Sequence, residues 1–170
     1  MPPDPVTSRM DRADRDVTGD VVLVTGATSG IGEETALRLG EQGATVLVHG
    51  RDRERGRRVV DEIREGPGEA ELFVADLASL DTVRGLAREV RDRHRRLDVL
   101  VNNAGLFLEE RRESADGYEL TFAVNHLAHY LLTHDLLDRL RDGGGRVVTN
   151  SSGLHERGEM EFSDLQFTDD

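Results

Sequence analysis

Short apolar runs recur along this 170-residue chain at intervals that suit buried parallel strands. The five runs lie at residues 21–24, 45–48, 72–75, 97–101 and 146–149. Segments of helical periodicity with one apolar face separate them, at residues 31–42, 53–65, 80–94 and 118–140. Strands that alternate with helices of this length form right-handed βαβ crossovers. The pattern therefore predicts an α/β fold, a doubly wound parallel sheet covered by helices on both faces.

The N-terminal residues carry no periodic apolar pattern and are rich in Asp, Arg and Pro. Residues 1–18 are therefore predicted to form a disordered or loosely attached arm. A chain of this length suits one domain with a sizeable core. We expect that single domain to occupy residues 19–170.

The composition excludes several function classes. Cysteine is absent, which rules out disulfides, thiolate metal sites and a cysteine nucleophile. With 34 acidic and 22 basic residues the net charge is −12, so the surface repels nucleic acid and anionic membranes. No apolar run approaches the roughly 18 residues of a membrane span, and the N-terminus lacks the apolar core of a signal peptide. We expect a cytoplasmic protein with no nucleic-acid partner and no membrane span.

All of the basic residues other than histidine are arginines, and the chain contains no lysine. Two explanations for this acidic, lysine-free composition stay open. One is a salt-adapted surface, because dense carboxylates maintain solubility at high ionic strength. The other is a GC-rich genome that favours arginine codons.

A glycine-rich turn follows the first predicted strand directly and leads into a helix. Its sequence, TGATSGIG over residues 25–32, places glycines at 26, 30 and 32. Such a turn suits a nucleotide pyrophosphate, because backbone N–H groups at a helix N-terminus bind phosphate and glycines allow close approach. Read alone, the turn is weak evidence and also allows a loop that binds no ligand, since the usual dinucleotide spacing is G-x-G-x-x-G. The position after the first strand favours cofactor binding, and the predicted contacts are Gly26, Thr28, Ser29, Gly30, Ile31 and Gly32.

Four further motifs follow in order along residues 21–153. They are Asp76-Leu77 after the third strand, Asn102-Asn103-Ala104-Gly105 after the fourth, Asn125 within VNHLAHY, and Ser151-Ser152 after the fifth. Together with TGATSGIG they resemble the short-chain dehydrogenase/reductase family, and the NHLAHY and SSGLH strings are similar to its retinol-dehydrogenase-like and protochlorophyllide-reductase-like branch.

The resemblance implies a Rossmann fold and hydride transfer between a nicotinamide cofactor and a small carbonyl or alcohol substrate. Asp76 and Leu77 are then expected to contact the adenine, while Asn103, Ala104 and Gly105 line the cofactor. Asn125 and Ser152 match the family's catalytic asparagine and serine. The resemblance also implies a homo-oligomer for the complete protein, since the family commonly dimerises through the helix predicted at residues 118–140.

Several of these residues have simpler interpretations. Asp76 suits a helix N-cap, Asn103 suits a turn, and Ser151 and Ser152 suit capping of the turn that follows them. The histidines at 126, 129 and 134 share one predicted helix, a spacing that invites a metal hypothesis. We expect no metal site, because no matched carboxylate or cysteine set accompanies them.

The residues at the end of the second strand favour NADP over NAD. An NAD site places an acidic residue there to accept hydrogen bonds from the ribose 2′-OH. Here the sequence reads His49-Gly50-Arg51, in which Gly50 leaves room for a 2′-phosphate and Arg51 can pair with it. The alternative is that Arg51 simply solvates an arginine-rich helix, so NAD stays possible.

The family's proton donor is missing from this sequence. The family uses a tyrosine whose pKa is lowered by a lysine in Tyr-x-x-x-Lys, and without lysine no such motif can occur. The two tyrosines, Tyr118 and Tyr130, both precede Ser152. We therefore expect a C-terminally truncated, incomplete Rossmann domain that is inactive alone. Two alternatives stay open: a non-catalytic dinucleotide-binding module and a non-functional remnant.

Overall fold

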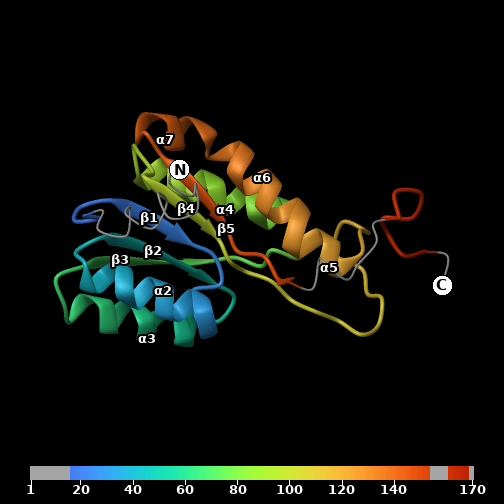
Figure 1. Cartoon of the computed structure of the whole chain (residues 1–170), viewed down its shortest axis with the longest axis horizontal. Coiled ribbons are helices and arrows are strands. Elements are labelled where there is room, and N and C mark those ends of the chain that lie inside the picture. Colours follow the sequence, from blue (N-terminus) through green and yellow to red (C-terminus); the bar gives the residue numbers. More distant parts are fainter. Residues whose placement is uncertain (1–15, 154–160, 169–170) are drawn as a thin grey trace, which may run out of the picture.

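The computed structural model describes residues 16–153 and 161–168. Its centre is a five-stranded sheet in the order β3-β2-β1-β4-β5, in which every neighbouring pair is parallel (Figure 1). The strands are β1 (Val21–Val24), β2 (Thr45–Gly50), β3 (Glu69–Val74), β4 (Val99–Asn102) and β5 (Arg146–Thr149). The chain first moves outward from β1 to β3 and then crosses to β4 and β5. The predicted doubly wound Rossmann fold is thereby confirmed.

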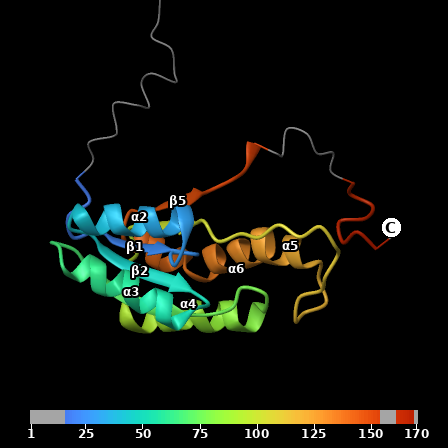
Figure 2. The same ribbon diagram turned by 90° about the horizontal axis from the view of Figure 1, so that it is seen from below.

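Helices connect the strands and cover the two faces of the sheet. They are α2 (Gly30–Glu41), α3 (Arg53–Arg64), α4 (Leu80–Arg93), α5 (Leu120–Phe122), α6 (Ala128–Asp135) and α7 (Leu137–Asp142). Figure 1 shows α2 and α3 together on one face, with α4 and α6 on the other, and in Figure 2 the face with α2 and α3 is turned towards the viewer.

The alternation of side chains along β1 and β2 divides the core into two layers. Val22 and Val48 belong to the layer that packs against α2 and α3. Leu23 and Leu47 point the opposite way, into the layer formed with α4 and α6. All four side chains are fully buried. A strand buried on both faces needs a continuous apolar run, which is why these two strands were recognisable in the sequence.

The helix predicted over residues 118–140 is not continuous. Helix α5 ends at Phe122, a π-helical turn spans Ala123–Leu127, and α6 then continues to Asp135. At Leu136 the backbone leaves the helical region, with φ −100° and ψ 4°, before α7 begins. Apolar periodicity reports which face is buried and is insensitive to such local changes of winding.

The third and fourth strands also differ from their predicted bounds. Strand β3 begins at Glu69, earlier than predicted, because it lies at the edge of the sheet and tolerates polar residues such as Glu71. Strand β4 begins at Val99, after the predicted start at residue 97. Asp98 occupies the junction, where its Oδ2 accepts a hydrogen bond from the N–H of Val21 at 2.8 Å.

The last residues of the predicted N-terminal arm contact the domain. Val17 packs against the core layer under α2 and α3, and the Thr18 hydroxyl donates to the carbonyl of Gln42 at 3.2 Å. Residues 1–15 of the predicted arm lie outside the described part of the chain.

Strand β5 forms the opposite edge of the sheet and is the least covered strand. All four of its residues are exposed, with Val147 and Val148 retaining 41% and 44% of their accessible surface. Among the described residues no further strand pairs with its outer edge.

Candidate cofactor-binding site

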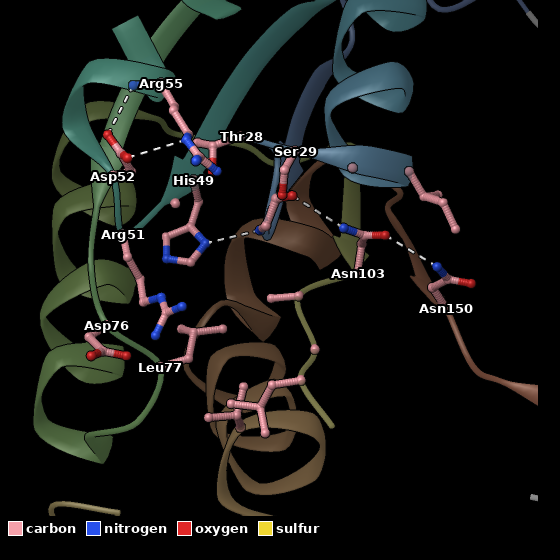
Figure 3. A pocket seen from close by; sticks show the side chains of 18 residues that line it. Thr28, Ser29, His49, Arg51, Asp52, Arg55, Asp76, Leu77, Asn103 and Asn150 are labelled. Carbon is pink, nitrogen blue, oxygen red and sulfur yellow. Dashed lines mark hydrogen bonds and ion pairs between the residues drawn. The ribbon is translucent and has the colours of Figure 1, made fainter. Parts of the chain in front are cut away.

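A cavity of about 800 Å³ opens at the carboxyl ends of the central strands. It lies where the chain reverses direction across the sheet, between the connections that follow β1 and β4, which is where open α/β sheets bind ligands. Figure 3 shows the side chains that line it, and they come from five strand ends and from α2, α3 and the π-helical turn. The lining residues are Gly26, Thr28, Ser29, Ile31, Gly32, His49, Gly50, Arg51, Asp52, Arg55, Asp76, Leu77, Asn103, Ala104, Gly105, Leu106, Val124 and Asn150.

The structure brings together the residues that the sequence assigned to cofactor binding. Every one of them lines the cavity except Gly30. Gly30 instead shapes the turn, since its φ of +57° lies in the left-handed region that favours glycine.

The glycine turn brings backbone close to the cavity. Gly26 has a φ of +66°, and a Cβ placed on it would meet the backbone of Ala104. A Cβ on Gly32 would overlap the side-chain amide of Asn103 and the carbonyl of Gly26. Ser29 is the N-cap residue of α2, and its hydroxyl makes no capping hydrogen bond. The N–H groups of the first helical turn are therefore left for a ligand at this end of the cavity.

Asn103 ties the glycine turn to the neighbouring strands. Its side-chain amide donates to the carbonyl of Thr25 at 2.9 Å, and its own N–H donates to the Thr25 hydroxyl at 2.9 Å. Its Oδ1 accepts from the side chain of Asn150 at 3.2 Å (Figure 3). Asn103 thus joins the ends of β1, β4 and β5. The simpler interpretation, that it is only a turn residue, does not account for these contacts.

The end of β2 is open and positively charged. A Cβ on Gly50 would meet the side chain of Thr28, so only glycine leaves this space free. Asp52 is engaged elsewhere, since its Oδ1 caps α3 by accepting from the N–H groups of Glu54 and Arg55 at 2.9 and 3.0 Å. The Arg55 guanidinium lies 3.4 Å from the same carboxylate. Arg51 and Arg55 therefore place two guanidinium groups on the lining where an NAD site has an acid.

Asp76 lines the cavity and does not cap a helix. Its Oδ1 accepts from the N–H of Ala78 at 3.0 Å, while the N-cap position of α4 belongs to Ser79. Leu77 beside it is nearly buried and adds apolar surface to the same wall. This pair suits the edge of a flat, largely apolar ring system.

Comparison with known proteins decides the family. The sequence profile described as short chain dehydrogenase matches residues 20–163. The chain belongs to the short-chain dehydrogenase family.

Relatives of known or assigned activity cover the same region. The chain is 45% identical over 148 residues to a putative daunorubicin C-13 ketoreductase from a Streptomyces strain, covering 86% of this chain and 51% of that protein. It is 41% identical to human retinol dehydrogenase 11, covering 87% of this chain and 48% of the other. The chain spans about half the length of the curated relatives it matches. Among solved structures, a metagenomic short-chain oxidoreductase in complex with NADP superposes with a TM-score of 0.71 at 35% identity, covering 79% of this chain and 62% of the other.

The two residues that match the family's catalytic positions lie outside the cavity lining. Asn125 belongs to the π-helical turn, where its side chain holds the loop after β4: Oδ1 accepts from the N–H of Leu106 at 2.9 Å and Nδ2 donates to the carbonyl of the same residue at 2.8 Å. Ser152 is exposed, two residues beyond the lining residue Asn150. Their catalytic roles stay predictions.

The histidines of the segment from α5 to α6 have different surroundings. His129 is buried, which lowers its pKa, while the backbone of Asn125 and the neighbouring His126 act on it more weakly and in opposite directions. His126 stacks on Phe122 and His134 on Tyr130, both at the surface. Within residues 16–153 and 161–168 no three His, Asp or Glu side chains gather as a metal site would require. No helix in this part of the chain is both long and apolar enough to cross a membrane.

Sequence reasoning missed several residues of the lining. One of them is His49, which precedes Gly50 and Arg51 directly, so its position at a strand end was the available signal. Asp52 and Arg55 could have been found from the first turn of α3, because helix N-termini after strands face the same edge. Asn150 directly follows β5 and carries the same strand-end signal. Leu106 and Val124 carry no such signal and are brought to the cavity only by the fold.

Proposed function

We propose that this chain is the dinucleotide-binding part of an NADP-dependent short-chain oxidoreductase that acts on a small carbonyl or alcohol substrate, with NAD as a possible weaker cofactor. The observation that carries the proposal is the cavity at the sheet reversal, which combines a glycine turn at one end with Arg51 and Arg55 at the other. The family relationship and the neighbours solved with NADP support it.

The cavity residues fit a phosphorylated dinucleotide. The glycine turn offers backbone N–H groups for the pyrophosphate, and close packing at Gly32 excludes a side chain from that place. The guanidinium of Arg51 suits a 2′-phosphate through paired charge-assisted hydrogen bonds, while Asp76 and Leu77 suit the adenine. When bound, the nicotinamide supplies or accepts the hydride. The residues of this chain bind and orient the cofactor and exclude water around it.

The experiment measures dissociation constants for NADP⁺ and NAD⁺ by titration calorimetry. Wild type should bind NADP⁺ more tightly, and Arg51→Ala should reduce that discrimination about tenfold, since a charge-assisted contact contributes about 1.5–3 kcal/mol. Arg57→Ala is the matched control, because it removes the same charge from an exposed position of α3 outside the cavity lining. Equal affinity of wild type for the two cofactors would refute the preference for NADP.

A second candidate is a non-catalytic dinucleotide-binding module. It is favoured by the positions of Tyr118 and Tyr130, which both lie outside the cavity lining. Oxidation of NADPH with a panel of aldehydes, ketones and quinones separates the two candidates. Turnover that Ser152→Ala abolishes would favour the enzyme, whereas cofactor binding without turnover favours the module. Cytoplasmic location and homo-oligomerisation of the complete protein stay predictions.

A further inference from the structure

The imidazole of His49 lies in the floor of the cavity, at the end of β2. Its side chain is almost completely buried, with 1% of its surface exposed. Figure 3 shows the ring between the glycine turn, represented by Thr28 and Ser29, and the loop that carries Leu77. It therefore stands between the part of the cavity that suits phosphate and the part that suits the adenine.

Both ring nitrogens have backbone partners from these two sides. The N–H of Gly26 donates to Nδ1 at 3.4 Å, and Nε2 lies 3.2 Å from the carbonyl of Ala75, the residue before Asp76. The carbonyl of His49 also accepts from the N–H of Ala27 at 2.8 Å. One residue of β2 thus holds two consecutive amides of the glycine turn and the end of β3.

These partners select one form of the ring. A carbonyl can only accept, so Nε2 must carry the proton, and an amide N–H can only donate, so Nδ1 must present its lone pair. The neutral Nε2–H tautomer alone satisfies both contacts. A protonated ring would turn a second N–H toward the N–H of Gly26, and that contact would be lost.

We propose that His49 is a positioning residue of the dinucleotide site, whose neutral Nε2–H imidazole fixes the Gly26 amide of the glycine turn relative to the end of β3. The proposal rests on the proposed function, since it assigns a role within the same cofactor site. This role explains why a polar ring is buried beneath the glycine turn. A valine or leucine could fill the same place without needing hydrogen-bond partners.

The electrostatic surroundings keep the ring neutral. Burial lowers the pKa of His49 to about 4. Two titratable side chains act on it from neighbouring elements: Asp76, in the loop after β3, favours the cation, and His129 of α6 opposes it. At pH 7 the ring is therefore in the form that the two contacts require.

Three substitutions separate the two contacts. In His49→Asn the Oδ1 occupies the place of Nδ1 and can accept from Gly26. In His49→Gln the side-chain amide reaches as far as Nε2 and can donate to Ala75. His49→Leu keeps a buried side chain of similar size without either contact.

The test measures the dissociation constant of NADP⁺ for the full 170-residue chain and the three variants. If His49 positions the glycine turn, the variants His49→Leu and His49→Gln should bind NADP⁺ about tenfold more weakly than wild type. His49→Asn keeps the contact with Gly26 and should weaken binding by about threefold or less. Equal affinity of wild type and His49→Leu would overturn the role while leaving the proposed function intact. A wild type that binds neither dinucleotide would refute both.

A second measurement needs no ligand and no variant. Long-range ¹⁵N–¹H NMR of the wild-type imidazole should show the Nε2–H tautomer at pH 7. The amide resonance of Gly26 should shift along the same titration curve as the ring of His49 as the pH is lowered. An Nδ1–H tautomer, or a Gly26 amide that does not follow that curve, would overturn the proposal.

Discussion

Strands β2 and β5 are both short, parallel and rich in valine, yet their surroundings differ completely. Five of the six residues of β2 are buried between helices on the two faces of the sheet. All four residues of β5 are exposed, although the strand pairs with β4 in regular register. Apolar β-branched residues thus suffice for pairing in the sheet, whereas burial depends on which helices the chain places over them.

The cavity lies on the boundary between these two regions. Its glycine turn and its arginines belong to the covered half, built on β1, β2 and α3. Asn150 enters it from the end of the exposed strand β5. Most of the residues predicted to contact the cofactor therefore belong to the well-packed half.

The largest expected effect is a loss of stability in acid that originates in the covered half. His49 takes up a proton near pH 6.5 in the unfolded chain but only near pH 4 in the folded one. Stability is therefore complete above pH 6.5 and falls as the pH is lowered towards 4, by roughly 3 kcal/mol from this residue. Burial of His129 acts in the same direction.

Urea unfolding between pH 7 and 4.5 measures this loss. His49→Asn should flatten the dependence, because asparagine takes up no proton over this range. The same slope in wild type and His49→Asn would contradict the assignment.

A matched pair of valines tests the comparison directly. Val48→Ala, in a fully buried position of β2, should lower the free energy of unfolding by roughly 2–3 kcal/mol, because two methyl groups are lost and a cavity remains. Val148→Ala, in β5 at 44% exposure, should cost less than about 1 kcal/mol. Urea unfolding gives both values, provided that the variants and wild type share the same dependence of the unfolding free energy on urea. Equal losses of stability in the two variants would show that β5 is covered in solution.

Two glycines of the turn should differ in their effect on cofactor binding. Gly32→Ala inserts a methyl group against Asn103 and the carbonyl of Gly26, and should weaken NADP⁺ binding at least about tenfold. Gly30→Ala meets no atom within 4 Å and strains only its left-handed backbone. Calorimetric titration with NADP⁺ checks that Gly32→Ala loses more affinity than Gly30→Ala. A larger loss in Gly30→Ala would show that the turn moves away from Asn103 when the cofactor binds.

The smallest expected effect concerns an exposed ion pair on the covered half. Arg38 and Glu34 lie 2.6 Å apart on α2, with 70% and 59% of their side-chain surfaces accessible. Glu34→Gln should therefore change stability by less than about 0.5 kcal/mol, and 1 M salt should remove the difference. A larger change in thermal unfolding would indicate that this helix surface is less exposed in solution.

The parts of the fold that could be predicted are those with a clear apolar pattern in the sequence, and the parts that could not depend on their surroundings in the folded chain. Strands β1 and β5 begin and end at the predicted residues, because their apolar runs are bounded by Gly, Asp and Asn. Strand β3 was placed too late, since edge residues such as Glu69 lack the apolar signal. The interruptions of the long helical segment were not predictable, because they depend on tertiary contacts such as that between Asn125 and Leu106.

The lining of the candidate cofactor site was predictable where contiguous motifs carry it. The glycine turn and Asn103-Ala104-Gly105 line the cavity as expected. Residues such as Leu106 and Val124 reach it through the packing of distant elements, which no local pattern encodes. The role of His49 depends on which backbone groups surround its ring, so it needed the three-dimensional structure.

The π-helical turn at Ala123–Leu127 behaves as a one-residue insertion in an otherwise ordinary helix. The N–H of Ala128 bonds to the carbonyl of Ala123, five residues back instead of four. Removing a single residue from this turn would let the same N–H and carbonyl bond in the regular α-helical pattern, four residues apart, so the helix on either side would nearly keep its present orientation. The stacked pair Tyr130 and His134 would be retained. The side chains of the turn itself would face other directions, and Asn125 would lose its two hydrogen bonds with Leu106. A deletion of one residue would thus remove one side chain's contacts and leave the two ends of the segment in place.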